Sequence, residues 1–149
     1  MKVCFDTCVI IDFLGKTKDC FNALVALDVA MLLNFETCCS VSSTTDVAYL
    51  MHSRGFANTK QQANKAVENV LTLFTLIDNT AADVKCAIAS NMNDYEDALI
   101  AQSCKRAGVS MIVTRNKKDF KNSPVPALTP QEFIDAHKPK DYVYEEAVL

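Results

Sequence analysis

The feature that most constrains this chain is its opening, where a short buried strand over residues 2–5 (KVCF) runs directly into Asp6. Apolar residues at helical spacing follow from Val9 to Leu14, and Gly15 ends that pattern. A buried strand that leads straight into a helix is the first unit of an α/β fold, whose parallel strands are covered on both faces. We therefore expect strands and helices to alternate along the chain.

The rest of the sequence continues this alternation. Short apolar runs predict further strands over residues 37–42, 75–78, 111–114 and 126–128. Apolar faces at helical spacing predict helices over residues 18–33, 44–55, 59–74, 80–90 and 94–107, and a short one starting at Thr129-Pro130. Ser42 and Ser43 are the expected N-caps of the helix over 44–55, and Asn79 or Thr80 that of the helix over 80–90. The order of elements predicts an α/β fold with a mostly parallel sheet and helices on both faces.

The composition suits one globular domain. The chain has 149 residues, of which 50% are hydrophobic and 22% charged, so it contains enough apolar material for a core. We expect residues 1–137 to form the domain and residues 138–149 an exposed tail. No apolar stretch reaches the roughly 20 residues that a membrane-spanning helix needs, and no signal peptide is visible. A cytoplasmic protein with no membrane partner is therefore expected.

Cysteine content and net charge narrow the function classes. The chain has seven cysteines and no CxxC pair, which favours reduced, buried thiols over a zinc site. The net charge of −3 argues against a nucleic-acid binder, because basic patches usually supply the affinity for phosphate. This charge is compatible with a nuclease whose acids hold cations, since bound cations reverse the local field.

Several acids lie where a site is expected. Asp6 ends the first strand, Asp119 follows the strand over 111–114, Asp94 and Asp97 open a helix, and Asp46 lies near the start of another. Ligands of open α/β sheets bind beyond the carboxyl ends of the strands, at a switch point in strand order. Each acid alone has a structural explanation as a helix cap, a partner of a helix dipole or a turn residue. Their joint placement at one edge of the sheet is what predicts a site.

Converging carboxylates favour a metal-dependent hydrolysis. They repel one another and raise each other's pKa unless a cation neutralises them, and Mg²⁺ and Mn²⁺ prefer oxygen ligands. Such ions make hydroxide from bound water near neutral pH and stabilise a departing oxygen, so no side-chain nucleophile is required. The sequence offers no Ser-His-Asp arrangement, no P-loop and no GxGxxG motif.

Three segments resemble the PIN domain family. The opening FDTCVIIDFL, the helix DYEDALIAQSCKRAG and the following TRNKKDF are similar to that family's characteristic elements, over residues 1–14 and 94–134. The resemblance implies a three-layer α/β/α sandwich, Rossmann-like, and a metal-dependent endoribonuclease with Mg²⁺ or Mn²⁺. It also implies a VapC-like toxin of a toxin–antitoxin pair as one role, with an antitoxin protein and a second copy of the chain as partners.

The resemblance also assigns residues. Asp6, Asp97 and Asp119 match the family's metal ligands, and Asp94 would reach a metal through water. Thr7, Thr114 and Asn116 would orient the ligands or water. The catalytic set implied is Asp6, Asp46, Asp97 and Asp119, although Asp46 stands where the family usually has Glu, and Cys8 where it has Asn.

The loop around Asp119 is basic and predicts an RNA contact. Its candidate residues are Arg115, Lys117, Lys118 and Lys121, although a Lys-rich loop that is simply solvated has the same composition. The shorter Asp46 and the acidic net charge leave an alternative function open. In that alternative the chain is a weak or inactive PIN-like module that binds RNA or a protein partner.

Overall fold

The computed structural model of the chain describes residues 1–53, 55 and 59–144. Within them, a five-stranded sheet has the order β3-β2-β1-β4-β5, and every neighbouring pair is parallel. Its strands are β1 (Lys2–Phe5), β2 (Glu36–Ser40), β3 (Thr75–Ile77), β4 (Met111–Val113) and β5 (Ala127–Leu128). The strand order reverses direction between β1 and β4, which makes this pair the switch point.

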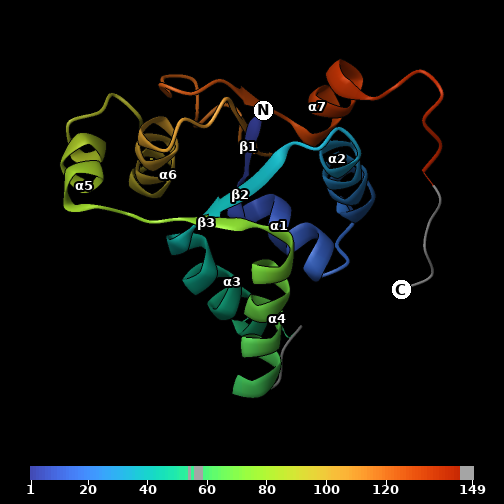
Figure 1. Cartoon of the computed structure of the whole chain (residues 1–149). Helices are drawn as coiled ribbons and strands as arrows, with labels where there is room; N and C mark the ends of the chain where they lie inside the picture. The colour runs from blue at the N-terminus through green and yellow to red at the C-terminus, as the bar shows by residue number, and fades with distance from the viewer. Residues whose placement is uncertain (54, 56–58, 145–149) are drawn as a thin grey trace.

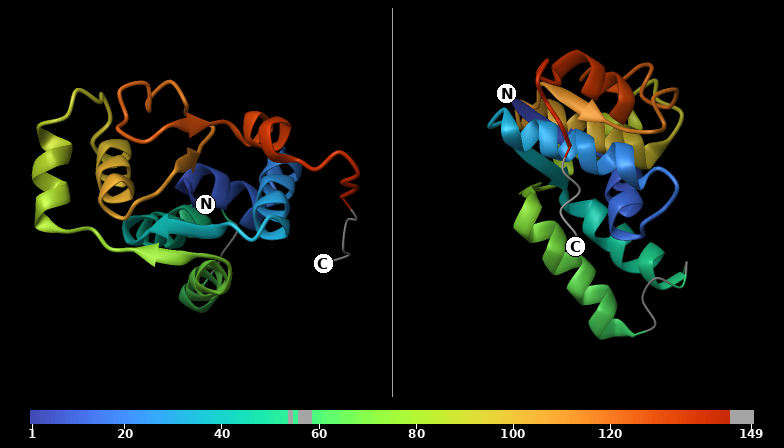
Figure 2. Two further views of the ribbon diagram at one scale, coloured as in Figure 1. Left: turned by 45° about the horizontal axis from the view of Figure 1, so that its top comes forward. Right: turned by 90° about the vertical axis from the view of Figure 1, so that its right-hand side faces the viewer.

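Helices cover both faces of the sheet, as the alternation predicts (Figure 1). The helices are α1 (Thr7–Leu14), α2 (Cys20–Leu32), α3 (Val41–Ser53), α4 (Lys60–Leu73), α5 (Ala81–Ile88), α6 (Tyr95–Arg106) and α7 (Pro130–His137). Helices α1, α2 and α7 lie on one side of the sheet, and α5 and α6 on the other. The paired helices α3 and α4 project from the body beyond β2 and β3 (Figure 2). The three-layer α/β/α sandwich is therefore confirmed.

Alternate residues of β1 supply the two halves of the core. Val3 and Phe5 are fully buried in the cluster formed with α1, α2 and α7, and the Phe5 ring lies 5.4 Å from that of Phe74. Cys4 points to the opposite face, where it is buried with residues of α6. Successive side chains of a strand point to opposite faces, so a strand buried on both sides is apolar throughout.

The helix starts differ in how their first N–H groups are bonded. Thr80 and Thr129 lie at predicted helix starts, and each forms a capping box with the residue three positions on. The prediction that Ser42 and Ser43 cap the third helix is wrong, because α3 already begins at Val41. The N–H of Ser42 donates instead to the Ser40 hydroxyl at 3.3 Å and to Asn79 Oδ1 at 3.2 Å, so a side chain beyond β3 completes this helix start.

The described part of the tail, residues 138–144, runs along α2 (Figure 1). The Tyr142 hydroxyl donates to Asp28 Oδ2 at 2.5 Å, and the Tyr144 ring meets Phe21 edge-on with centroids 5.5 Å apart. Residues 145–149 lie outside the described residues, and the division of the chain at residue 137 stays a prediction. No helix in the described ranges is long and apolar enough to cross a membrane.

Candidate active site

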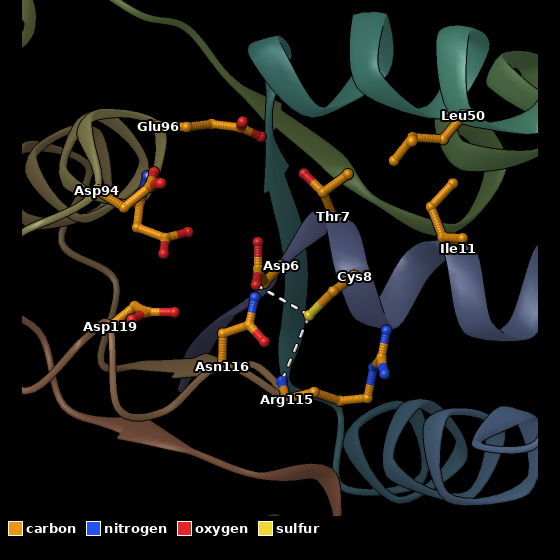
Figure 3. A pocket seen from close by; sticks show the side chains of 11 residues that line it. Asp6, Thr7, Cys8, Ile11, Leu50, Asp94, Glu96, Arg115, Asn116 and Asp119 are labelled. Atoms are coloured by element: carbon orange, nitrogen blue, oxygen red, sulfur yellow. Dashed lines mark hydrogen bonds between the residues drawn. The ribbon is translucent and has the colours of Figure 1, made fainter. Parts of the chain in front are cut away.

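A pocket of about 200 Å³ opens at the switch point between β1 and β4 (Figure 3). Its wall comes from the start of α1, the start of α6 and the loop after β4, with apolar residues of α1 and α3 at one end. The lining residues are Asp6, Thr7, Cys8, Ile11, Leu50, Asp94, Glu96, Asp97, Arg115, Asn116 and Asp119. The fold thus brings Asp6, Asp94, Asp97 and Asp119 together, as the sequence predicts.

Asp6 is fixed by side chains rather than used as a helix cap. It occupies the N-cap position of α1, but its side chain makes no capping bond there. Its Oδ2 instead accepts from the Thr114 hydroxyl at 2.7 Å and from the Cys8 thiol at 3.0 Å. Burial raises the pKa of Asp6, and these two bonds counteract part of that increase. The carboxylate is therefore held in one orientation at the end of β1.

Asp97 is an acid whose pKa the pocket raises strongly. Burial, followed by the charges of Asp6, Asp94, Asp119 and Glu96, raises the pKa of Asp97 from 3.8 to about 7. Asp94 has a structural role as well, because its Oδ1 accepts from the Asp97 N–H at 3.1 Å as the N-cap of α6. Strongly shifted acids in a cleft are typical of functional sites.

The loop after β4 carries Asp119 to the same pocket. The Asn116 N–H donates to the Thr114 hydroxyl oxygen at 2.9 Å, and the Asp119 N–H donates to the Asn116 carbonyl at 2.8 Å. The loop therefore turns back on itself beside Asp6 (Figure 3). Thr114 is buried and reaches the pocket through its bond to Asp6.

Glu96, and not the predicted Asp46, lines the pocket. Asp46 lies in the second turn of α3, not the first, and is absent from the pocket lining. Glu96, which the sequence analysis missed, lines the pocket from α6. Burial and the neighbouring Asp46 carboxyl raise the pKa of Glu96 to about 7. Asp46 therefore approaches the pocket through its contact with Glu96.

Thr7 ties the first helix to the third. Its hydroxyl donates to the Ser43 hydroxyl at 2.8 Å, and both side chains are buried. This bond fixes α3, which carries Asp46, against the start of α1. Thr7 therefore lines the pocket as a structural support for its acids.

The basic loop is only partly available to a ligand. Arg115 Nε contacts Asp12 Oδ2 at 2.5 Å, and Lys117 Nζ contacts Glu132 Oε1 at 2.7 Å. Lys118 and Lys121 are exposed. The Arg115 guanidinium is engaged with Asp12 and Asp19, and its contact with RNA stays a prediction.

The donor chemistry of the pocket suits a hard divalent cation. The polar lining is dominated by carboxylates, and their mutual repulsion would be relieved by positive charge. Among the described residues, however, no group of three acidic, histidine or cysteine side chains is already arranged to hold a metal ion. The residues thus fit such an ion by ligand type and charge.

Residues 2–118 match the PIN domain family. No curated protein matches the chain.

The fold is similar to several solved structures. VapBC2 from Rickettsia felis, bound to a DNA fragment from their promoter, has 18% identity and a TM-score of 0.63, covering 87% of this chain and 98% of that one. A toxin–antitoxin complex from Klebsiella pneumoniae has 19% identity and a TM-score of 0.61, covering 86% and 97%. VapBC-1 from nontypeable Haemophilus influenzae has 15% identity and a TM-score of 0.63, covering 88% and 99%. At these identities the likeness shows a shared fold.

Proposed function

Because this chain belongs to the PIN domain family, we propose that it is a metal-dependent endoribonuclease that uses Mg²⁺ or Mn²⁺ at the pocket between β1 and β4. The observation that carries the proposal is the crowding of carboxylates around Asp97, whose pKa is raised to about 7 by burial and by neighbouring acids. PIN domain proteins are typically nucleases, which agrees with a hydrolase.

Asp6, Asp97 and Asp119 are the residues that would hold the ion, with Asp94 reaching it through water. When bound, a divalent ion lowers the pKa of water and stabilises charge on the phosphate. The Thr114 hydroxyl and the Cys8 thiol keep one oxygen of Asp6 engaged, so the carboxylate presents a fixed orientation. Asn116 lines the pocket beside them and can orient water or the scissile phosphate.

The polar side chains of the pocket support water as the nucleophile. The Thr7 hydroxyl donates to Ser43, so its proton is already committed. Burial, together with the charge of Asp6, raises the pKa of Cys8 to about 12, which keeps the thiol protonated at neutral pH. Because the thiolate is the reactive form of cysteine, Cys8 acts here as a hydrogen-bond donor.

We propose that exposed lysines of the loop guide RNA past the acids. Lys118 and Lys121 are the better candidates, because Lys117 is paired with Glu132 and Arg115 with Asp12. Each phosphate contact should contribute a salt-dependent increment to affinity. The net charge of −3 makes this local patch, rather than the whole surface, the source of attraction.

The test substitutes Asp97 by Asn and measures cleavage of single-stranded RNA with Mn²⁺, with Mg²⁺ and with EDTA. The parent is expected to cut only with a metal, and Asp97→Asn to lose both cleavage and saturable Mn²⁺ binding in calorimetry. Asp135→Asn is the matched control, since Asp135 is exposed on α7. Undiminished cleavage by Asp97→Asn would disprove the metal-site assignment.

The structural neighbours favour a toxin of a toxin–antitoxin pair, because several of them are toxin–antitoxin complexes. We accordingly propose an antitoxin protein as partner and a homodimer as the assembly. Induced expression should arrest growth, and co-expression of a small protein encoded beside it should relieve the arrest. Light scattering measures the assembly. The cytoplasmic location stays a prediction.

The second candidate function is a non-catalytic PIN module that binds RNA or a protein. Asp46 favours it, since this shorter acid is absent from the pocket lining. Mn²⁺ calorimetry separates the two candidates. Absence of saturable binding at millimolar Mn²⁺ favours the module, and binding accompanied by RNA cleavage favours the nuclease.

A further inference from the structure

Arg115 lies between the acidic pocket and α1, and its backbone and side chain face different ways. Its backbone N–H donates to the Cys8 sulfur at 3.4 Å, whereas its side chain runs along α1, away from Asp94 and Asp119 (Figure 3). Its Nε contacts Asp12 Oδ2 at 2.5 Å and its Nη1 contacts Asp19 Oδ2 at 3.2 Å. We call Arg115, Asp12 and Asp19 the arginine clamp.

The clamp is anchored on α1 at two points one turn apart. Cys8 and Asp12 are four residues apart on this helix and therefore share a face. Arg115 meets the first through its backbone and the second through its guanidinium. Two such contacts on one rigid helix restrict both the position and the direction of the loop after β4.

Thr17 holds the acidic half of the clamp in place. Its hydroxyl donates to Asp12 Oδ1 at 2.7 Å and accepts from the Asp19 N–H at 3.3 Å. The Thr17 N–H also donates to the Asp12 carbonyl at 3.1 Å. The Asp12 carboxylate and the backbone of Asp19 are therefore held before the arginine reaches them, which lowers the conformational entropy lost when the pairs form.

Burial makes the ion pair of Asp12 and Arg115 costly in free energy. The Asp12 side chain is only 2% exposed, so its charge has almost no contact with water. Buried ion pairs add little net stability, and loss of one partner leaves an uncompensated charge. The Arg115 guanidinium instead bridges two carboxylates, through the ion pair with Asp12 and the hydrogen bond from Nη1 to Asp19 Oδ2, and this restricts its direction.

From these contacts we propose that Arg115 is a positioning residue, which holds the loop of residues 114–119 against α1 so that Asn116 and Asp119 face Asp6. This inference rests on the proposed nuclease function, and it replaces the expectation that Arg115 binds RNA. The loop it holds contains the Thr114 hydroxyl that bonds Asp6 at 2.7 Å. Displacing reacting groups by about 1 Å can lower a rate on the order of 100-fold.

The first experiment needs neither metal nor RNA. Hydrogen exchange of the parent and of Asp12→Asn is compared at the amides of Arg115, Asn116 and Asp119, each of which is hydrogen-bonded. Exchange at these amides is expected to accelerate by roughly 10-fold or more in Asp12→Asn, with α6 unchanged. Unaltered exchange in this loop would overturn the proposal.

The second experiment separates positioning from RNA contact by steady-state cleavage. Asp12→Asn leaves the arginine present, so an RNA-binding Arg115 would keep kcat unchanged, whereas a positioning Arg115 predicts a kcat lowered roughly 10- to 100-fold at constant KM. Arg115→Gln should show the same loss of kcat, and Arg115→Lys should recover part of it. A raised KM with normal kcat in Arg115→Gln would contradict the proposal.

Asp83→Asn is the matched control. Asp83 is also a buried carboxylate that meets an arginine, Arg106, at 2.9 Å, but it lies outside the pocket. It is expected to lower stability while leaving kcat unchanged well below the unfolding temperature. If the parent fails to cut RNA, the nuclease proposal fails and hydrogen exchange still decides the clamp. If the parent cuts and Asp12→Asn matches it, the clamp alone is wrong.

Discussion

Replacing Asp97 by Asn should stabilise the metal-free protein at pH 8, even though it removes a proposed metal ligand. At that pH the Asp97 carboxyl of the parent is ionised next to Asp6, Asp94, Asp119 and Glu96. Asparagine keeps the size of the side chain and removes its charge. The N–H of residue 97 still donates to Asp94, so the helix start is retained.

The size of the effect follows from the raised pKa of Asp97, which is about 7 compared with an ordinary 3.8. At 1.36 kcal/mol for each unit of pKa, this difference corresponds to about 4 kcal/mol of unfavourable interaction in the ionised state. Water in the open pocket screens these charges, so we expect about 2 kcal/mol. That free energy corresponds to an increase in Tm of roughly 4–8 °C for a chain of this length.

The pH dependence has a definite sign. Between roughly pH 4 and pH 7 the folded state holds a proton at Asp97 that the unfolded state has released, so the parent loses stability as pH rises through this window. Asp97→Asn carries no such proton. The difference in the free energy of unfolding should therefore be largest at pH 8 and close to zero at pH 4.

Urea unfolding in EDTA at pH 4, 6 and 8 measures this difference, with Asp135→Asn as the control for removing an exposed acid. Saturating Mn²⁺ should make the parent the more stable protein at pH 8, because the ion stabilises only the protein that binds it. Equal or lower stability of Asp97→Asn at pH 8 without metal would refute the reasoning, since the carboxylates would then not be crowded.

Three further outcomes are expected. Asp83→Asn should lower the free energy of unfolding by about 2 kcal/mol at pH 7, because a charged hydrogen-bonded pair with Arg106 is lost; urea unfolding measures this. Burial raises the pKa of Asp83, but the bonds from Thr80 and Arg106 lower it by more, so the net pKa is lowered. The stability that Asp83 contributes is therefore present above roughly pH 4 and disappears as pH falls through the lowered pKa. A difference in stability between the parent and Asp83→Asn that stays the same from pH 7 to pH 3 would contradict this. Asp46→Glu should raise kcat/KM for RNA cleavage by roughly 10-fold, since the longer side chain reaches the pocket, and a decrease would show that Glu96 already fills that place. Phe5→Ala should cost about 4 kcal/mol in urea unfolding, because this fully buried ring packs against other aromatic rings; a cost under about 1 kcal/mol would indicate a core that collapses around the gap.

The sequence alone determined the features that depend on neighbouring residues. The run from β1 into Asp6, the parallel sheet and the helix starts at Thr80 and Thr129 were all predictable. Periodicity and capping act within a few residues, so the same chemistry appears in the sequence and in the fold. The meeting of Asp6, Asp97 and Asp119 was also predictable, because the carboxyl ends of parallel strands share one edge.

The tertiary structure decided the features that depend on distant side chains. The predicted start of α3 lay too late in the chain, because Ser42 already lies inside the helix, where its N–H donates both to Ser40 and to Asn79 beyond β3. Glu96 rather than Asp46 reached the pocket because of how α3 and α6 sit around it. The Arg115 guanidinium contacts Asp12, more than a hundred residues earlier in the chain, although the neighbouring lysines of its loop suggested a phosphate contact. Such partners are chosen by packing in three dimensions, which local residue patterns do not encode.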